Sequence, residues 1–489
     1  MATHRTEELH ELIAILSASL EVLMSPTTSA VEIGLPDGFS GFALRPGDTG
    51  YDDARAMYNG MIDRRPAIII QPRSAADVRD AVAFARQQKL PIAVRCGGHS
   101  VAGVSIVEAG VLLDLSTLKG VHVDPERGTA IANAGVLWGE YDRVTEMFGL
   151  ATPGGRVTTT GVGGFTLGGG YGWLSPKHGL AADNLVGADL MTPGGHLVHV
   201  TDDTNPELMW ALRGAGSNFG VVTSYELRLH PVPPLVMAGL LLVPNDDGTG
   251  ERIRAYRDYI ESAPEELSTV LATVLAPPAD FVPPELVGSP SFGIALAWFG
   301  DPSDAEDAVA PLRRIMEGGI DLVQPMPYTA LQALLEDFNP PGMLNYHRGR
   351  LVDGLTDTVL DDYLALGRDI HSPLTQGIIF RNGGAISRVG EDDTAVSGRS
   401  APWLAHPIAC WQSPSETEYE RGWCDRFTAA FSPVESGVRY LNFEPDTDTE
   451  SVQSGFGSTK YARLAALKQE WDPDNLFRGN HNISPAGEA

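Results

Sequence analysis

Two glycine-containing segments hold the residues with the clearest chemical potential. The first is Arg95-Cys96-Gly97-Gly98-His99-Ser100, which directly follows an expected strand. Its two glycines let the backbone turn sharply and approach a ligand closely, and the histidine after them is held outward on a rigid base. A structural Gly-Gly turn with an incidental histidine is the competing interpretation.

The second segment, Gly154 to Trp173, is far richer in glycine. Its bare N–H groups could line an anion such as a pyrophosphate, and the hydroxyls of residues 158–160 add donors. A flexible linker is the alternative interpretation. The apolar residues Val162, Phe165 and Leu167 argue against it, because a linker of this type would be polar.

The elements that must position these segments begin with a β-α-β unit. Ala67 to Ile70 predicts a short buried strand, and Ser74 is a candidate N-cap for the helix that follows. Val78, Ala81, Val82 and Ala85 would form the apolar face of that helix. Further strands are expected at Ile92–Val94, Val111–Leu115, Ala130–Ala134, Leu185–Met191 and Val221–Leu229.

Three prolines, Pro231, Pro233 and Pro234, mark a plausible domain boundary. We expect an N-terminal extension (1–60), a cofactor domain (61–232), an α+β substrate domain (233–437) and a C-terminal segment (438–489). Within the last two parts the sequence predicts helices at Glu251–Ser262, Ala305–Glu317 and Lys460–Glu470, and strands at Ser291–Trp298 and Pro407–Trp411.

Bulk properties exclude several classes of function. The chain has 489 residues, enough for two or three lobes. Its net charge of −28 would repel phosphate backbones and anionic lipids, so neither nucleic acid nor membrane is expected as a partner. Leu12 to Met24 reads as an amphipathic helix and not as a signal peptide. Three cysteines give no disulfide framework or zinc spacing, so we expect no metal and a cytoplasmic location.

Common nucleotide-binding and hydrolase motifs are missing. The nearest approach to a Rossmann fingerprint, Gly214 to Phe219, lacks the third glycine. There is no Walker A lysine motif, no His-Glu-x-x-His and no Gly-x-Ser-x-Gly. A nucleotide, if bound, must use another scaffold.

The order of the motifs resembles the FAD-linked oxidases of the vanillyl-alcohol-oxidase type, in particular the berberine-bridge-enzyme-like branch. The resemblance covers roughly Ala67 to Pro485. Its four matching stretches are the β-α-β unit leading into Arg95–Ser100, Val157–Trp173, Asp183–Leu185 with Asp202 and Leu208–Gly220, and Tyr440–Phe443 with Tyr461–Pro485.

This resemblance implies an α+β fold. A PCMH-type FAD-binding domain of two subdomains would be joined to a substrate domain with an antiparallel sheet, and the C-terminal segment would return to the FAD domain. The implied activity is oxidation of an alcohol-type carbon of a small molecule, a sugar or secondary metabolite, by hydride transfer to FAD. Molecular oxygen is the expected re-oxidant, and the oligomeric state stays open.

The resemblance also implies site residues. His99 would hold FAD covalently, and Tyr440 would act as general base, with positive charge from Arg399 or Arg439 to lower its pKa. Asn442 and Tyr346 are the other catalytic candidates, and His347 and His406 could line the substrate pocket. The expected cofactor-binding residues are Arg95, Cys96, Gly97, Gly98, His99, Ser100, Val157, Thr158, Thr159, Thr160, Gly161, Gly163, Gly164, Tyr171, Gly172, Asn480 and Asn482.

One position departs from the family pattern. Members with two covalent bonds to FAD have Cys-Pro where this chain has Val157-Thr158, so no second, cysteinyl bond can form there. Cys96 is not at the attachment position and is interpreted as a small buried thiol, as are Cys410 and Cys424.

Three other functions remain open from sequence. One is a flavin dehydrogenase with another electron acceptor, since Thr160 lies where relatives control oxygen access. Another is a flavoprotein that sequesters a drug-like compound and confers resistance. The last is a glycine-rich α/β protein without cofactor.

Overall fold

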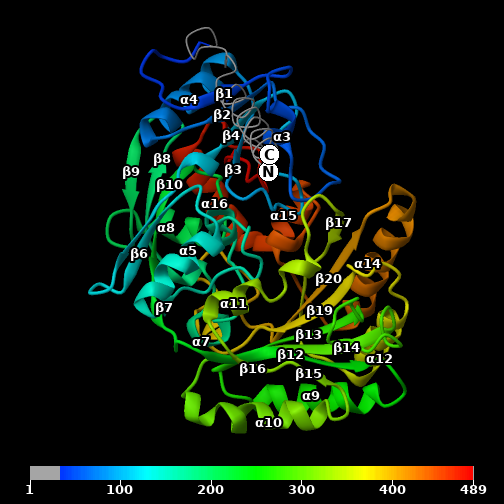
Figure 1. Ribbon diagram of the computed structural model, residues 1–489. Coiled ribbons are helices and arrows are strands. Elements are labelled where there is room, and N and C mark those ends of the chain that lie inside the picture. Colours follow the sequence, from blue (N-terminus) through cyan, green and yellow to red (C-terminus); the bar gives the residue numbers. More distant parts are fainter. Residues whose placement is uncertain (1–33, 488–489) are drawn as a thin grey trace, which may run out of the picture.

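Three large β-sheets organise the chain, as seen in a computed structural model that describes residues 34–487, and β7 (Leu150–Ala151) and β11 (His230–Pro231) form a small fourth one. A four-stranded sheet lies at the top of Figure 1, a five-stranded sheet at the left and a ten-stranded sheet at the bottom and right. The helix expected over Leu12–Met24 lies outside the described residues.

The four-stranded sheet contains the expected β-α-β unit. Its strands lie in the order β1 (Phe42–Leu44), β2 (Ile68–Gln71), β4 (Val111–Asp114) and β3 (Ile92–Arg95). β2, β4 and β3 are parallel, and β1 is antiparallel to β2. Helix α4 (Ala75–Gln88) begins as expected at Ser74, whose Oγ accepts a hydrogen bond from the Asp77 amide at 3.1 Å. β3 therefore ends directly at the segment that carries His99.

The five-stranded sheet is antiparallel. Its central strands are β8 (Leu185–Met191), in which five of seven residues are buried, and β10 (Val221–Arg228), which alternates buried and less buried residues only after Thr223. β5 (Val121–Asp124), β6 (Thr129–Asn133) and β9 (Leu197–Val200) complete it, in the order β5-β6-β10-β8-β9. Helices α5 (Trp138–Thr145), α6 (Val162–Leu167) and α8 (Pro206–Leu212) connect these strands.

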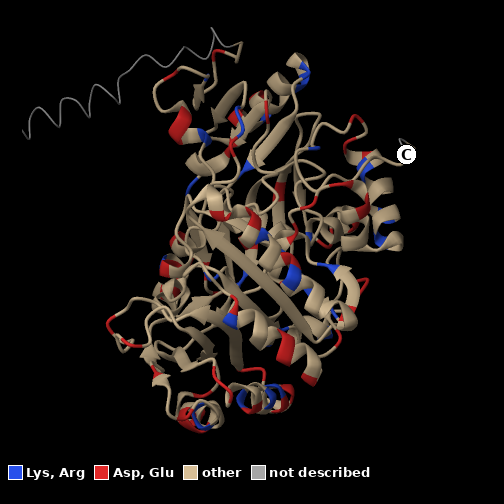
Figure 2. Cartoon of the chain, turned by 90° about the vertical axis from the view of Figure 1, so that its right-hand side faces the viewer, with Lys and Arg blue, Asp and Glu red and all other residues tan. Residues whose placement is uncertain are grey.

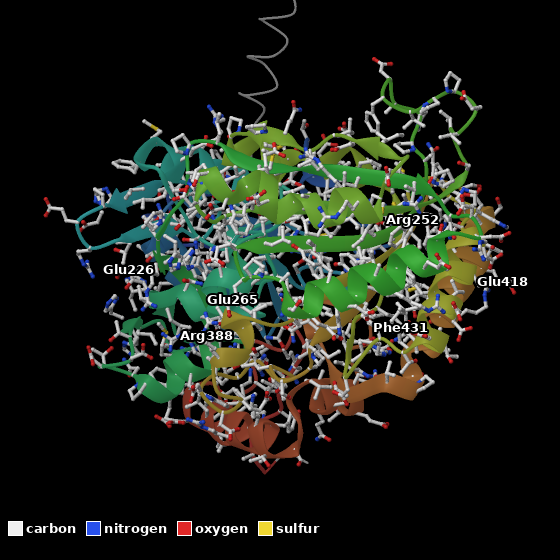
Figure 3. All side chains as sticks on the ribbon, turned by 90° about the horizontal axis from the view of Figure 1, so that it is seen from below. Glu226, Arg252, Glu265, Arg388, Glu418 and Phe431 are labelled. Carbon is white, nitrogen blue, oxygen red and sulfur yellow. The ribbon has the colours of Figure 1, made fainter. Side chains whose placement is uncertain are left out.

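The ten-stranded sheet is antiparallel, and its outer face is covered by helices. Helices α9 (Thr249–Ser262), α10 (Ala305–Ile315), α12 (Asp357–Arg368) and α14 (Thr417–Phe431) cover this face, which Figure 3 shows from below. The strands are β12 (Val236–Pro244), β13 (Leu267–Leu275), β14 (Pro290–Trp298), β15 (Ile320–Asp321), β16 (Gln324–Met326), β17 (Leu344–His347), β18 (Arg350–Val352), β19 (Gln376–Arg381), β20 (Trp403–Trp411) and β21 (Glu435–Arg439).

Strand alternation divides the side chains of this sheet between two environments. On β19, Ile379 packs into the core beneath the helices, whereas Ile378 and Phe380 point to the other face. On β20, Ala405 faces the helices and His406 faces away from them. The free face of the sheet can therefore form the wall of a site.

The C-terminal segment returns to the four-stranded sheet. After α15 (Thr449–Phe456) and α16 (Ser458–Trp471), Gly479 forms an isolated parallel bridge with Ala93 of β3. Together with the three sheets, this confirms the expected α+β fold with a returning C-terminal segment. No helix within residues 34–487 combines the length and apolar character needed to cross a bilayer. Figure 2 shows that acidic and basic residues are spread over many of the helices and loops.

A buried ion pair fixes this return. The side chains of Lys468 and Asp472 have no solvent exposure, and Lys468 Nζ lies 2.7 Å from Asp472 Oδ2. Nζ also donates to the carbonyls of Asn218 and Phe477 at 2.6 and 2.9 Å. The carboxylate of Asp472 in turn accepts from the amides of Leu476 and Phe477. A single ammonium thus joins α16, the loop before β10 and the C-terminal segment.

We expect Lys468→Met to lower the free energy of unfolding by about 3–5 kcal/mol, because it leaves the Asp472 carboxylate buried without its cation. Denaturant unfolding of the purified protein measures this change. Lys119→Met is the matched control, since Lys119 and Glu140 form an exposed pair worth less than about 1 kcal/mol. A loss at Lys468 no larger than the control would contradict the prediction.

Candidate active site

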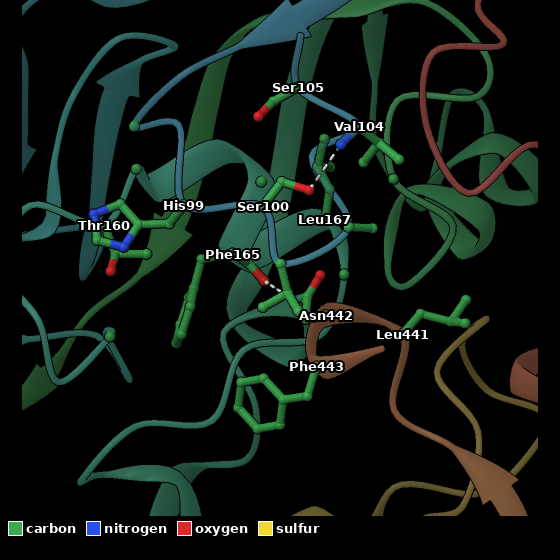
Figure 4. A pocket seen from close by; sticks show the side chains of 18 of the residues that line it. His99, Ser100, Val104, Ser105, Thr160, Phe165, Leu167, Leu441, Asn442 and Phe443 are labelled. Carbon is green, nitrogen blue, oxygen red and sulfur yellow. Dashed lines mark hydrogen bonds between the residues drawn. The ribbon is translucent and has the colours of Figure 1, made fainter. Parts of the chain in front are cut away.

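A cavity of about 350 Å³ lies between the cofactor-side loops and the free face of the ten-stranded sheet. Its loop side is formed by Ser105, Asn218, Asn480 and His481, and its sheet side by His347, Ile378, Phe380, His406 and Ile408. The segments containing His99, Thr160 and Asn442 meet at this cavity (Figure 4). Parts of the chain more than 300 residues apart in sequence therefore contribute to one site.

The two glycine-containing segments cross in direct backbone contact. A Cβ on Gly97 would overlap the backbone nitrogen of Gly161, and a Cβ on Gly161 would overlap Cys96 Sγ. By contrast, a Cβ on Gly164 would meet open space, and Gly164 lines the cavity. Gly97 and Gly161 thus allow the two segments to cross, whereas Gly164 leaves open space beside the cavity.

The Gly168-Gly169-Gly170 run receives the C-terminal segment. A Cβ on Gly168 would overlap the Asn442 amide, and one on Gly169 would lie 3.0 Å from Tyr440 Cε2. Gly169 and Gly170 also have φ values of 120° and 88°, where side chains are strained. These glycines therefore place the side chains of Tyr440 and Asn442 at the cavity.

His99 lies where the crossing segments meet. Its Nε2 is 2.9 Å from Thr159 Oγ1, and its ring stacks on Tyr58 with centroids 3.9 Å apart. No hydrogen bond involves Nδ1 among the described residues. Burial lowers the pKa of His99 to about 4, so the imidazole is neutral near pH 7.

Sequence reasoning missed Tyr58, which falls in the expected N-terminal extension. Its hydroxyl donates to the Asn339 carbonyl at 2.8 Å, and its amide donates to the Gly98 carbonyl at 3.4 Å. An isolated tyrosine in the sequence carries no signal for such a contact.

Val157 and Cys96 both line the cavity. Val157 offers no sulfur, and burial raises the pKa of the Cys96 thiol to about 11. Cys96 Sγ lies 3.6 Å from the Val136 carbonyl, so it is a protonated thiol at neutral pH.

Most of the expected cofactor-binding residues meet at the cavity, but six do not. Those that line it are Cys96, Gly97, Gly98, His99, Ser100, Val157, Thr160, Gly161, Gly164, Tyr171 and Asn480. The six that do not line it are Arg95, Thr158, Thr159, Gly163, Gly172 and Asn482.

The Arg95 guanidinium is paired with a carboxylate of the protein and is not free to bind an anionic ligand. Its Nη2 is 2.8 Å from Asp114 Oδ2, and the group also donates to the carbonyls of Ala54 and Ala56. Its donors thus tie β3 to β4 and to α3 (Tyr51–Arg55) and the residue after it. The structure does not bring Arg95 to the cavity.

Tyr440 and Asn442 form a hydrogen-bonded pair at the cavity. The Tyr440 oxygen accepts from the Gly170 amide at 2.7 Å and from Asn442 Nδ2 at 3.2 Å. Burial raises the Tyr440 pKa to about 12, and these two donors act against that rise. The hydroxyl hydrogen has no acceptor among the described residues, so it can be offered to a ligand.

The positive charge expected beside Tyr440 is not supplied by either arginine. Arg399 pairs with Asp183 at 2.6 Å, and Arg439 donates to Ser451 and lies 4.0 Å from Glu444. Neither guanidinium contributes to the Tyr440 pKa. Two neutral donors, the Gly170 amide and the Asn442 amide, stand where a cation was expected.

Tyr346 points away from the cavity, and its neighbour His347 points into it. The Tyr346 ring packs beneath α14, where Arg348 Nη2 donates to its hydroxyl at 2.6 Å. Successive residues of β17 face opposite sides of the sheet, so only one of the two can reach the cavity. The structure brings His347, and not Tyr346, to the site.

His347 and His406 form an imidazole pair on the sheet side. His406 Nε2 lies 3.3 Å from His347 Nδ1, and the His406 ring stacks on Phe443 with centroids 3.6 Å apart. Burial lowers the pKa of His347 to about 4 and that of His406 well below its usual value. Both rings are therefore neutral at pH 7, and the buried Nδ1 of His406 has no partner among residues 34–487.

Unpartnered polar atoms also mark the loop side. Within the described chain, Asn480 Oδ1, His481 Nε2 and Ser105 Oγ are buried and make no hydrogen bond. Buried polar groups are normally satisfied, so these atoms suit the hydrogen-bonding groups of a bound ligand. Sequence reasoning singled out Asn480 but not Ser105 or His481.

Comparison with known proteins identifies what this ligand is. The family model described as "FAD binding domain" matches residues 66–201, and "Berberine and berberine like" matches residues 439–484. These ranges contain His99, the glycine-rich run and the Tyr440–His481 segment that meet at the cavity. The chain thus contains an FAD-binding segment and a berberine-like C-terminal segment, and the relatives it is similar to are FAD-linked oxidoreductases.

Individual relatives cover nearly the whole chain. (R)-6-hydroxynicotine oxidase of Paenarthrobacter nicotinovorans is 29% identical, over 93% of this chain and 99% of the relative. Tetrahydroberberine oxidase of Berberis wilsoniae is 27% identical, over 86% of each protein. The crystal structure of 6-hydroxy-D-nicotine oxidase from Arthrobacter nicotinovorans matches with a TM-score of 0.81 and 28% identity, over 92% of this chain and 99% of that chain.

The residues present fit FAD. The berberine-bridge-like C-terminal segment contributes the unpartnered atoms of Asn480 and His481 to the loop side. Gly164 and Gly216 have open space where a Cβ would be, and both line the cavity. The cavity thus offers hydrogen-bonding groups and bare backbone on one side and aromatic rings on the other.

Proposed function

We propose that this FAD-dependent oxidoreductase holds FAD covalently through His99 alone and oxidises an alcohol- or amine-bearing carbon of a small molecule, with O2 as re-oxidant. The observation that carries this proposal is the meeting of a neutral, half-buried His99 with the Tyr440–Asn442 pair at one cavity. Bound FAD would supply the hydride acceptor, and the protein supplies binding, orientation and electrostatics.

The environment of His99 supports attachment through Nδ1. The Thr159 hydroxyl occupies Nε2, and stacking on Tyr58 holds the ring in place. Because the pKa of His99 is lowered to about 4, the free nitrogen retains its lone pair at neutral pH. Val157 cannot form a thioether and the Cys96 thiol is protonated, so one covalent bond is the expected number.

The Tyr440–Asn442 pair is the proposed site of proton transfer from the substrate. A general base must lie within hydrogen-bond reach of the proton that it removes. The amides of Gly170 and Asn442 both donate to Tyr440 Oη and would stabilise its phenolate form, which is the form that can accept the substrate's proton. The neutral pair His347–His406 lies on the same side of the cavity and can orient the substrate by hydrogen bonds.

The names of two relatives bear on the substrate class. They denote oxidases of 6-hydroxynicotine and tetrahydroberberine, which are amine-containing ring compounds. The aromatic rings at the present cavity, those of Phe380, Phe443 and Tyr171, suit a ring of similar character.

We expect the purified protein to keep its flavin when precipitated with acid. Mass spectrometry of a digest should find FAD mass on the peptide that contains His99. The His99→Ala variant should release its FAD on denaturation while keeping its fold. An unmodified His99 peptide in active wild-type protein would refute the covalent bond.

Tyr440→Phe removes the proposed base and keeps the ring. With any substrate that reduces the wild-type flavin, this variant should slow anaerobic flavin reduction by ~10²-fold or more. Tyr346→Phe is the matched control, since its hydroxyl lies on the opposite face of the sheet. Near-normal reduction in Tyr440→Phe would remove this residue from the role of base.

Oxygen as re-oxidant can be tested without a known substrate. Enzyme reduced with one equivalent of dithionite and mixed with aerated buffer should be re-oxidised rapidly and release one H2O2 per flavin. Slow re-oxidation in air, together with rapid re-oxidation by a quinone or dye, would establish a dehydrogenase in place of an oxidase.

A further inference from the structure

Among the described residues, the lining of the cavity contains one side chain that is charged at neutral pH. Among its lining residues within 34–487 there is no Asp, Glu or Lys, and Arg156 is the sole arginine. This is unusual in a chain whose net charge is −28, because acidic residues outnumber basic ones 63 to 35. The positive charge at this place therefore needs its own explanation.

The Arg156 guanidinium lies between two aromatic rings. It is 4.8 Å from the centre of the Trp173 ring and 4.7 Å from that of Phe380 on β19. Its Nη2 donates to the Gly172 carbonyl at 3.1 Å, whereas its Nε is buried without a partner. Two rings and one carbonyl thus fix the orientation of the guanidinium plane, and most of its five N–H donors have no partner among the described residues.

No carboxylate within residues 34–487 pairs with this guanidinium. Burial lowers the pKa of Arg156 to about 9, so the group is still a cation at neutral pH. A charge that is largely removed from water and has no counter-ion is costly to a folded protein. The buried arginines each have one: Arg95 pairs with Asp114, Arg350 with Glu444 and Arg399 with Asp183.

The position of Arg156 favours a ligand over a structural role for the missing anion. Phe380 belongs to the sheet side, and the charge of Arg156 contributes to the low pKa of His406. The unpartnered atoms that fit FAD lie instead on the loop side, at Ser105, Asn480 and His481. The free guanidinium donors therefore belong to the part of the cavity that a substrate would fill.

We propose that the substrate carries a carboxylate, which Arg156 binds through its planar fork between Trp173 and Phe380. The inference rests on the proposed function, because it names the substrate class of that same cavity. A guanidinium matches a carboxylate with two parallel hydrogen bonds, which a lysine could not reproduce. The substrate is thus a hydroxy or amino compound with an acidic group, seated with that group on the aromatic pair.

Isothermal titration calorimetry of the purified holoprotein with acetate, benzoate and cinnamate tests this proposal. At least one of the three should bind saturably, and Arg156→Gln should weaken it by roughly 30-fold or more. Binding of the matching amides, acetamide, benzamide and cinnamamide, should be the same in both proteins. Arg421→Gln is the control, since Arg421 lies over Tyr346 beyond the opposite face of the sheet.

Two outcomes would overturn the proposal. One is the absence of saturable binding for all three carboxylates, and the other is equal affinity in wild type and Arg156→Gln. If Arg156→Gln does not fold, Arg156→Lys takes its place and should bind the carboxylate about 10-fold more weakly, because it keeps the charge but not the fork. An affinity equal to wild type in that variant also overturns the proposal.

Failure of this proposal is distinguishable from failure of the proposed function. Calorimetry reports carboxylate binding whether or not flavin is covalently attached, and mass spectrometry reports attachment whether or not a carboxylate binds. A protein with FAD on His99 and no carboxylate affinity would keep the oxidoreductase assignment and lose only the substrate class.

Discussion

The crossing of two backbone segments at Gly97 and Gly161 is the constraint on which the site depends. No Cβ fits at either residue, because each would overlap atoms of the other segment. This contact places Thr159 beside His99 Nε2 and brings α6 against the end of β3. The crossing therefore restricts the orientation of the His99 side chain, and stacking on the Tyr58 ring restricts it further.

A second long-range contact completes the cavity from the other end of the chain. Tyr440 and Asn442 fit against Gly168–Gly170, and the Lys468–Asp472 pair fixes the segment that carries Asn480 and His481. Asp472 is only four residues from Lys468, but Lys468 Nζ also reaches the Asn218 carbonyl, 250 residues away in sequence. Tyr440 is likewise 270 residues from Gly170, so the cavity forms only in the complete fold.

Local patterns predicted much of the fold and the approximate place of the site. The Ser74 cap, the strand at Leu185–Met191 and the helix after Lys460 follow from spacing and capping rules, and the structure confirms them. What local patterns could not supply was the direction of side chains at long-range contacts. Tyr346 and His347 are adjacent, and only the register of β17 against β20 decides which one faces the cavity. Arg95 and Arg399 looked available in the sequence, but each has a buried carboxylate partner brought by another strand or loop.

Charge is distributed in a way that serves redox chemistry in an acidic protein. Carboxylates are excluded from the cavity lining within the described chain, and the histidines there are neutral because burial lowers their pKa values. Hydride transfer to a flavin adds negative charge to the site, and nearby carboxylates would oppose it. Neutral donors around Tyr440 and a single cation at Arg156 avoid that opposition. The excess of acidic residues is therefore compatible with this chemistry because it is kept outside the cavity, whose walls are glycine, aromatic rings and neutral imidazoles.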